Sequence, residues 1–310
     1  MGTPEYAAVS LRRLLESPHR VRAVVTRPDK PRGRGRNIEP GPVRRVAEEA
    51  GIEVLAPASA RDETFLQRLH SLRADLGVVV AYGRILPAAA LAAPRLGCIN
   101  AHASLLPELR GAAPIERSIL AGLTRTGVTI MQMNEGLDEG DILFASEVAI
   151  LDETTGGSLR EQLAGLSAQM LVEAVDRVAS GSVHPVAQDN ARATFAPPLR
   201  REETAIRWGE DAHALWLRVR AFAPRPGAFA LDGRARLKIL EARVAAPAAT
   251  PAAPGTIIAQ SGAAIVVACG TGALALHTVQ PEGKRAMAAR DWALGLRDRG
   301  DPPHVLHDGI

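Results

Sequence analysis

Short apolar runs alternate with helical patterns along the first 150 residues, and this alternation constrains the fold more than any other feature. The strand-like runs, rich in β-branched or apolar residues, are 21–26, 75–82, 97–102 and 129–133. The segments with helical spacing between them are 7–16, 42–50, 63–72 and 114–121. Strands that alternate with helices predict a parallel sheet with crossover helices. We therefore predict a doubly wound α/β layout.

The pattern changes after a long helical segment at 158–179, which we expect to close the first domain. Residues 1–183 are predicted to form this domain around a mostly parallel, Rossmann-like sheet. Residues 184–203 contain Pro185, Pro197 and Pro198 and little apolar periodicity, which predicts a linker. The strand-like runs of the second half are 228–231, 236–240, 256–259, 264–268 and 273–279. They predict a small C-terminal β-barrel domain over 204–310.

Composition excludes several classes of protein. The two cysteines, Cys98 and Cys269, are far apart and belong to no CxxC motif, so neither a thiolate metal site nor a disulfide framework is indicated. No apolar run approaches the roughly 20 residues needed to cross a bilayer, and the N-terminus lacks the pattern of a secretory signal. We expect a cytoplasmic protein. The net charge is only +3, but basic residues gather in 27–36, which reads RPDKPRGRGR.

Three polar residues stand out from apolar surroundings. Asn100 and His102 are two positions apart on a predicted strand, so their side chains leave the same face. Pro107 stops that strand, which places both residues at the carboxyl edge of the sheet, where open α/β folds bind ligands. Asp138 follows the next strand, between Gly136 and Gly140, and glycines allow a tight turn and close approach to a ligand.

An amide, an imidazole and a carboxylate are the groups expected for acyl transfer to an amine. The amide and the imidazolium donate hydrogen bonds to a developing oxyanion, and the carboxylate steadies the imidazolium and relays the proton of the amine. A single buried Asn or His more often only satisfies its own hydrogen bonds. The clustering of three such residues favours the catalytic interpretation.

Two long segments carry a family resemblance. INAHASLLPELRGAAPIERSI and TGVTIMQMNEGLDEGD resemble the signature of the folate-dependent formyltransferases. Further segments, GTPEY, RPDKPRGRGR, VVVAYGRILP, RAFAPRPGAF and VQPEGKRAM, are similar to the branch of that family that acts on initiator methionyl-tRNA. Together they cover nearly the whole chain.

The resemblance implies an activity and a set of site residues. The activity is transfer of the formyl group of 10-formyltetrahydrofolate to the α-amino group of methionine on initiator tRNA, in translation initiation, without a metal, a membrane or a protein partner. The catalytic residues would be Asn100, His102 and Asp138. Folate would contact Arg84, Ile85, Leu86, Ser104, Leu105, Leu106 and Pro107, and tRNA would contact Arg32, Arg34, Arg36, Lys284 and Arg285.

The chain departs from the family pattern in three places. Met1 to Pro4 match the end of the family's first β-strand, so we expect either that the start is misassigned or that the sheet lacks that strand. Ala101 stands where a larger aliphatic residue is usual, and Pro198 replaces a customary lysine in the predicted linker.

Other functions stay open at this point. They are formylation of a small amine such as glycinamide ribonucleotide or an amino sugar, hydrolysis of 10-formyltetrahydrofolate, and RNA binding without catalysis. A dinucleotide-dependent enzyme is disfavoured because no GxGxxG motif follows an early strand.

Overall fold

The structure is a computed structural model that describes residues 1–29, 31–32, 37–246, 252–296 and 304–309. The chain divides into two compact units that interleave along the sequence. The first comprises Met1–Pro114, Arg125–Ala149 and Arg160–Pro197, and the second comprises Ile115–Thr124, Ile150–Leu159 and Pro198–Ile310. The predicted domain boundaries, 1–183, 184–203 and 204–310, follow sequence order and stay a prediction.

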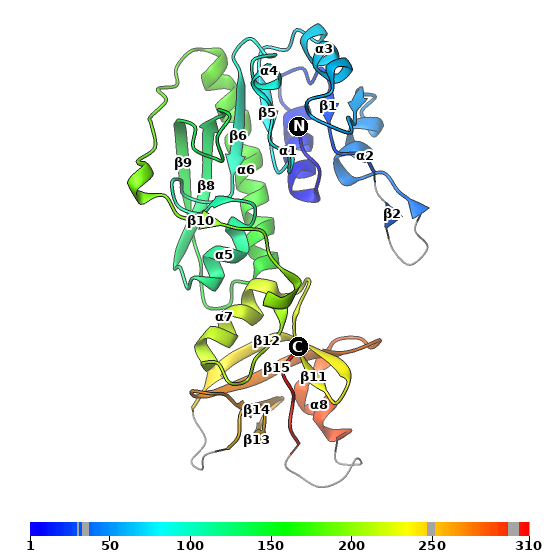
Figure 1. Ribbon diagram of the computed structural model, residues 1–310, viewed down its shortest axis with the longest axis vertical. Helices are drawn as coiled ribbons and strands as arrows, with labels where there is room; N and C mark the ends of the chain where they lie inside the picture. Colours follow the sequence, from blue (N-terminus) through cyan, green and yellow to red (C-terminus); the bar gives the residue numbers. More distant parts are fainter. Residues whose placement is uncertain (30, 33–36, 247–251, 297–303, 310) are drawn as a thin grey trace. The chain divides into compact units, whose positions relative to one another are not determined.

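Helices separate single strands or short runs of strands through the first 200 residues (Figure 1). The helices are α1 (Glu5–Leu15), α2 (Pro42–Glu49), α3 (Glu63–Ser71), α4 (Ala88–Leu91), α5 (Pro114–Leu120) and α6 (Gly156–Ala179). The strands are β1 (Val24–Val25), β2 (Pro31–Arg32), β3 (Asn37–Ile38), β4 (Val54–Leu55), β5 (Gly77–Val79), β6 (Cys98–His102), β7 (Arg110–Gly111), β8 (Arg125–Gln132), β9 (Ile142–Ala149) and β10 (Phe195–Ala196). The predicted α/β layout is confirmed.

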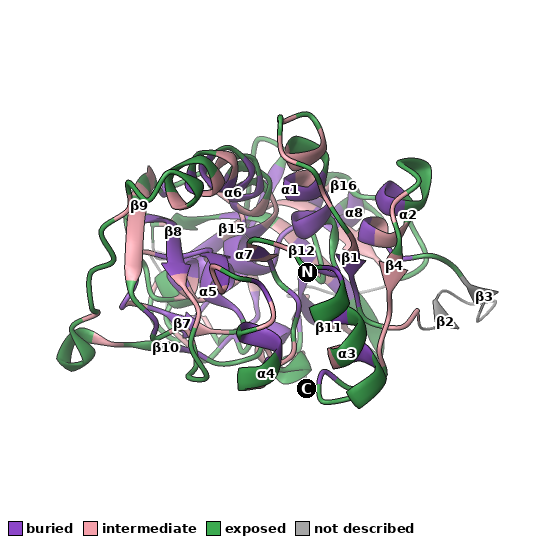
Figure 2. Cartoon of the chain, turned by 90° about the horizontal axis from the view of Figure 1, so that it is seen from above, coloured by how far each residue is buried: buried purple, intermediate pink, exposed green. Residues whose placement is uncertain are grey.

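The main sheet of the first unit has the strand order β5-β6-β8-β9. β5 and β6 pair in parallel, with Val79 opposite Asn100, whereas β8 and β9 run antiparallel. β1 and β4 form a separate parallel pair. β8 is almost entirely buried, and β9 is intermediate or exposed along its length (Figure 2). This half-exposed β9 was not predicted.

Helix α6 presents the predicted apolar stripe. Leu163 and Leu171 are fully buried along it. The Tyr6 hydroxyl of α1 lies 2.7 Å from Ser167 Oγ and donates to the Leu163 carbonyl at 3.2 Å. Burial raises the pKa of Tyr6 to about 12. The two helices therefore lie side by side through a buried polar contact.

The first two residues contact the segments that contain β1 and β5 through their backbones. Gly2 pairs in parallel with Val80, and its N–H donates to the Val25 carbonyl at 2.9 Å. The Met1 amine donates to the Val78 carbonyl at 2.6 Å. Beside these residues lies a cavity of about 730 Å³, lined in part by 21–25 and 74–78. The cavity thus lies beside the β1 and β5 segments.

The second unit contains an antiparallel sheet with the strand order β11-β12-β15-β14-β13. Its strands are β11 (Ala228–Asp232), β12 (Ala235–Ala245), β13 (Ile257–Ser261), β14 (Ala264–Ala268), β15 (Ala273–Pro281) and β16 (Met287–Ala288), which pairs with β15. In its C-terminal segment the described α-helices are α7 (Ala212–Phe222) and α8 (Ala289–Leu294), and residues 115–120 of α5 also belong to this unit.

The predicted barrel is an open antiparallel sheet whose two edges are linked by the end of the chain. His307 bridges Leu231 on β11, and Val305 bridges Thr256 next to β13. Within the described residues, no continuous strand closes the sheet.

Both cysteines are buried as free thiols, one in each unit. Burial raises the pKa of Cys98 to about 11 and that of Cys269 to about 12. A thiol with so high a pKa is a poor nucleophile at neutral pH. In the part of the chain that the structure describes, no helix combines the length and apolarity needed to span a membrane.

The cavity beside Met1 generates a stability prediction. Fusing about five β-branched apolar residues upstream of Met1 is expected to continue the backbone hydrogen bonds of Met1 and Gly2 and to fill the hollow. The fusion also removes a buried amine whose pKa is lowered to about 6 by burial. We expect the melting temperature, measured by calorimetry, to rise by about 4 °C or more.

A glycine–serine extension of the same length is the control for this fusion. It also removes the buried amine but supplies no side chains for the cavity, so it is expected to raise the melting temperature less than the apolar fusion does. Equal melting temperatures for the two fusions would contradict the prediction.

Candidate active site

Strand β6 fixes the first two candidate residues. It pairs with β5 on one side and β8 on the other, and all five of its residues are buried. Asn100 is 8% exposed and His102 is 6% exposed. Because they alternate along one strand, both side chains leave the same face of the sheet, as predicted.

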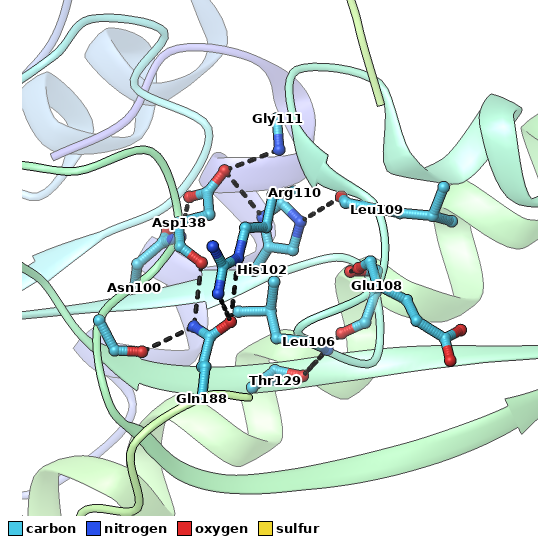
Figure 3. A network of polar contacts seen from close by, with 12 residues as sticks. Asn100, His102, Leu106, Glu108, Leu109, Arg110, Gly111, Thr129, Asp138 and Gln188 are labelled. Atoms are coloured by element: carbon cyan, nitrogen blue, oxygen red, sulfur yellow. Dashed lines mark hydrogen bonds and ion pairs between the residues drawn. The ribbon is translucent and has the colours of Figure 1, made fainter. Parts of the chain in front are cut away.

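Asp138 approaches both residues from a turn that follows β8. Its Oδ1 lies 3.5 Å from Asn100 Nδ2, and its Oδ2 lies 3.6 Å from His102 Nδ1 (Figure 3). The Gly111 N–H donates to Oδ2 at 2.9 Å. The structure therefore brings Asn100, His102 and Asp138 together, while their catalytic roles stay a prediction.

The backbone of Asp138 is left-handed, with φ of 53°. This conformation is unfavourable for residues other than glycine, so the contacts around Asp138 must hold its backbone in place. Gly140 is required by close approach, since a Cβ there would overlap the Gln132 carbonyl. The flanking glycines were predicted to allow a tight turn, and the structure assigns the positive φ to Asp138 itself.

His102 is oriented by the carbonyl of Leu109. Its Nε2 lies 2.9 Å from that oxygen, which can only accept, so Nε2 carries a hydrogen. Nδ1 then faces Asp138 at a distance longer than a good hydrogen bond. Nδ1 is therefore the ring nitrogen that faces the carboxylate.

The predicted folate-binding run, 104–107, is held by Thr129 of β8. The Thr129 hydroxyl donates to the Ser104 carbonyl at 2.7 Å and accepts from the Leu106 N–H at 3.0 Å. Ser104 Oγ donates to the Glu108 carbonyl at 2.6 Å. Ser104, Leu106 and Pro107 are buried, and Leu105 is half-buried. These hydrogen bonds therefore fix the backbone conformation of residues 104–107.

The second predicted folate segment, 84–86, follows β5. It therefore lies on the same edge of the sheet as the run after β6, since the two strands are parallel. Arg84 Nη1 donates to the Pro57 carbonyl at 2.8 Å, Leu86 is buried, and Ile85 is 73% exposed. Ile85 is thus the member of this segment that is most open to a ligand.

The predicted tRNA contacts are described only in part. Arg34 and Arg36 lie outside the described residues. Arg32 belongs to β2, which pairs with β3, and its side chain is not described. Lys284 and Arg285 are exposed between β15 and β16 in the second unit. All five contacts stay a prediction.

Three further polar residues adjoin the site and were not predicted. Arg110 of β7 is only 4% exposed, and its Nε and Nη2 donate to Gln188 Oε1 at 3.1 and 2.8 Å. Its Nη2 also donates to Asn190 Oδ1 at 2.7 Å. Gln188 and Asn190 fall in the predicted linker, where β10 pairs with β7. The one sequence feature that could have pointed to these residues is the position of Arg110 within the segment INAHASLLPELRGAAPIERSI.

Asn100 and His102 place hydrogen-bond donors next to the carboxylate of Asp138. Within the described ranges, no cluster of three or more His, Cys, Asp or Glu side chains could hold a metal ion. The arrangement suits chemistry in which negative charge develops on an oxygen while a proton leaves a nucleophile.

Family models match both halves of the chain. The model described as formyl transferase matches residues 1–175, and the model described as formyl transferase, C-terminal domain, matches residues 198–297. A protein named methionyl-tRNA formyltransferase from Marinobacter nauticus is 44% identical over 290 residues, which cover 94% of this chain and 93% of that relative.

Solved structures share the fold at low sequence identity. An N-formyltransferase from Helicobacter canadensis, in complex with folinic acid and dTDP-3-aminofucose, has a TM-score of 0.65 at 14% identity, covering 90% of this chain and 97% of that chain. HypX from Aquifex aeolicus, in complex with tetrahydrofolic acid, has a TM-score of 0.59 at 17% identity, covering 82% of this chain and 44% of that chain. At such identities these likenesses show the fold alone.

The contacts of Thr129 generate a prediction for stability. Thr129→Val removes the hydroxyl that pairs with the buried run, leaving the Leu106 N–H and the Ser104 carbonyl without this partner. We expect the free energy of unfolding, measured by urea denaturation, to fall by about 1–3 kcal/mol.

The matched control for Thr129→Val lies on the same strand. The Thr126 hydroxyl is buried and has no hydrogen-bond partner within the described structure. Thr126→Val is therefore expected to be neutral or stabilising. Equal destabilisation by the two substitutions would contradict the role given to Thr129.

Proposed function

The chain belongs to the formyl transferase family, and on this premise we propose that it transfers the formyl group of 10-formyltetrahydrofolate to the α-amino group of methionine on initiator tRNA. Identity of 44% over nearly the full length to a methionyl-tRNA formyltransferase supports this substrate pair. The observation that carries the chemistry is the meeting of Asn100, His102 and Asp138 at the end of β6.

The reaction begins when the neutral amine attacks the formyl carbon carried on N10 of the folate. The carbonyl oxygen becomes an oxyanion, and Asn100 Nδ2 donates to it. The contact of this amide with Asp138 is long, at 3.5 Å, so the amide is available to turn toward the substrate. Loss of one such donor costs about 100- to 1,000-fold in rate.

His102 supplies a second donor through Nδ1. The Leu109 carbonyl holds Nε2, so rotation of the ring is restricted and Nδ1 stays directed at the site. When protonated, this nitrogen donates to the oxyanion, and the carboxylate of Asp138 stabilises the charge of the ring.

Asp138 accepts the proton that leaves the attacking amine, through a water. The Gly111 N–H anchors Oδ2, which keeps the carboxylate in place during proton transfer. A general base of this kind contributes about 100- to 10,000-fold. The tetrahedral intermediate then collapses, the bond from carbon to N10 breaks, and N10 takes up a proton. The amine is the nucleophile, so no covalent intermediate with the protein is required.

Binding of tRNA completes the proposal. Arg32, Arg34, Arg36, Lys284 and Arg285 are the residues that would contact it. Guanidinium groups pair with phosphates and stack on unpaired bases, which suits the acceptor end of tRNA. The reaction prepares the initiator for translation and takes place in the cytoplasm.

A formylation assay tests the proposed function. Purified protein, 10-formyltetrahydrofolate and methionyl initiator tRNA are expected to give formylmethionyl-tRNA, with much slower formylation of methionyl elongator tRNA. Formylation of an amino sugar or glycinamide ribonucleotide, but not of charged tRNA, would overturn the proposal. Release of formate without any acceptor would indicate a hydrolase instead.

The carboxylate of Asp138 is tested by an isosteric substitution. Asp138→Asn removes the proton acceptor and is expected to lower formylation by about 100- to 10,000-fold in single-turnover assays. Folate affinity, measured by fluorescence titration, is expected to stay within about twofold, because the predicted folate segments 84–86 and 104–107 are unchanged.

The control for Asp138→Asn is Asp141→Asn. Asp141 lies in the same segment but is exposed, so formylation is expected to be unchanged. Near-normal turnover of Asp138→Asn would reject its catalytic role.

A further inference from the structure

The turn that carries Asp138 has to be held in a conformation that its backbone disfavours. A left-handed residue other than glycine costs about 1 kcal/mol or more and persists when surrounding contacts over-determine it. The Gly111 N–H fixes the carboxylate at 2.9 Å but not the peptide groups of the turn. A separate contact to the backbone of the turn is therefore needed.

Gln188 makes that contact. Its Nε2 donates to the Asp138 carbonyl at 2.9 Å and to the Gly140 carbonyl at 2.7 Å (Figure 3). Both hydrogens of one amide group are used, and they bridge two carbonyls on either side of Glu139. A single side chain thus spans the turn that orients Asp138.

The orientation of this amide is itself fixed. Gln188 Oε1 accepts from Arg110 Nε and Nη2 at 3.1 and 2.8 Å. Because a guanidinium only donates and a carbonyl only accepts, the alternative flip of the amide would oppose like groups at both ends. Asn190 Oδ1 accepts from Arg110 Nη2 at 2.7 Å and holds the guanidinium in turn.

Strand β7 connects the two supports of Asp138. Arg110 acts on the backbone of the turn through Gln188, and the next residue, Gly111, acts on the carboxylate directly. β10 pairs with β7 in parallel, so the segment that contains Gln188 is fixed to the same short strand. The carboxylate and the peptide groups of Asp138 are therefore held by one element.

We propose that Gln188 is a positioning residue for the proposed formyl transfer, acting by holding the 138–140 turn so that the Asp138 carboxylate faces Asn100 and His102. This inference rests on the proposed function. Gln188 touches no reacting atom, and its effect passes through the turn. Misplacement of a catalytic group by about 1 Å costs about 100-fold, which sets the scale of the expected effect.

Gln188→Glu tests the proposal with little change of shape. The carboxylate still accepts from Arg110 but cannot donate to either carbonyl. We expect kcat for formylation to fall by about 10- to 100-fold, with KM for charged tRNA within about threefold. Gln188→Met removes the same donors without adding charge, and it is expected to act in the same direction.

Amide hydrogen exchange provides a readout that does not depend on activity. The Gly111 N–H donates to Asp138 Oδ2, so its exchange rate reports whether the carboxylate stays in place. We expect this exchange to be faster by about tenfold or more in both variants. Gln169→Glu, on the exposed face of α6, adds the same charge elsewhere and is expected to change neither readout.

The outcomes distinguish the positioning role of Gln188 from the proposed formyl transfer to charged tRNA. Slower turnover together with faster Gly111 exchange supports the proposal. Unchanged exchange, or faster exchange with unchanged kcat, overturns it. If the wild-type protein formylates no charged tRNA, the proposed function fails, and the exchange measurement still decides whether Gln188 holds the turn.

Discussion

The site depends on one carboxylate held against a disfavoured backbone. Asp138 contributes an oxygen to Asn100, faces His102 with the other, and has a positive φ. Its position is set by hydrogen bonds from Gly111 and Gln188 and not by local preference. If the Asp138 carboxylate moved by a few ångströms, it could no longer act as the general base of the proposed reaction. The other residues of the site therefore depend on this turn being held in place.

The holding contacts come from segments that are far apart in sequence. β6 supplies Asn100 and His102, β7 supplies Arg110 and Gly111, and the turn after β8 supplies Asp138. Gln188 arrives from a segment 50 residues further along the chain. Such a site forms only once the sheet and the β7–β10 pair are both in place, so its geometry is a property of the folded unit and not of any one motif.

Much of the fold and of the candidate site could be predicted from the sequence. The parts that could not be predicted were missed for identifiable physical reasons. Helices α2, α3 and α6 begin or end within two residues of their predicted bounds, because apolar spacing marks a buried face. Helix α7 was missed, although Asp211 caps it by accepting from the N–H groups of His213 and Ala214. Gln188 could not be found, because a side chain that bonds to backbone carbonyls leaves no periodicity, and neighbouring prolines suggested a linker. The resemblance to formyltransferases was confirmed by the family match.

The polar contacts around Asp138 fall into two groups by length. Those from the supporting residues are short, and those with Asn100 and His102 are long. Gln188, Gly111 and Arg110 make hydrogen bonds of 2.7–3.1 Å, whereas Asn100 and His102 lie 3.5 and 3.6 Å from Asp138. Groups that face a substrate are often slack before it binds and tighten with it. Groups that only support them have no such reason to move. The short contacts thus belong to residues that hold the backbone, and the long ones belong to the residues that would meet the formyl group in the proposed reaction.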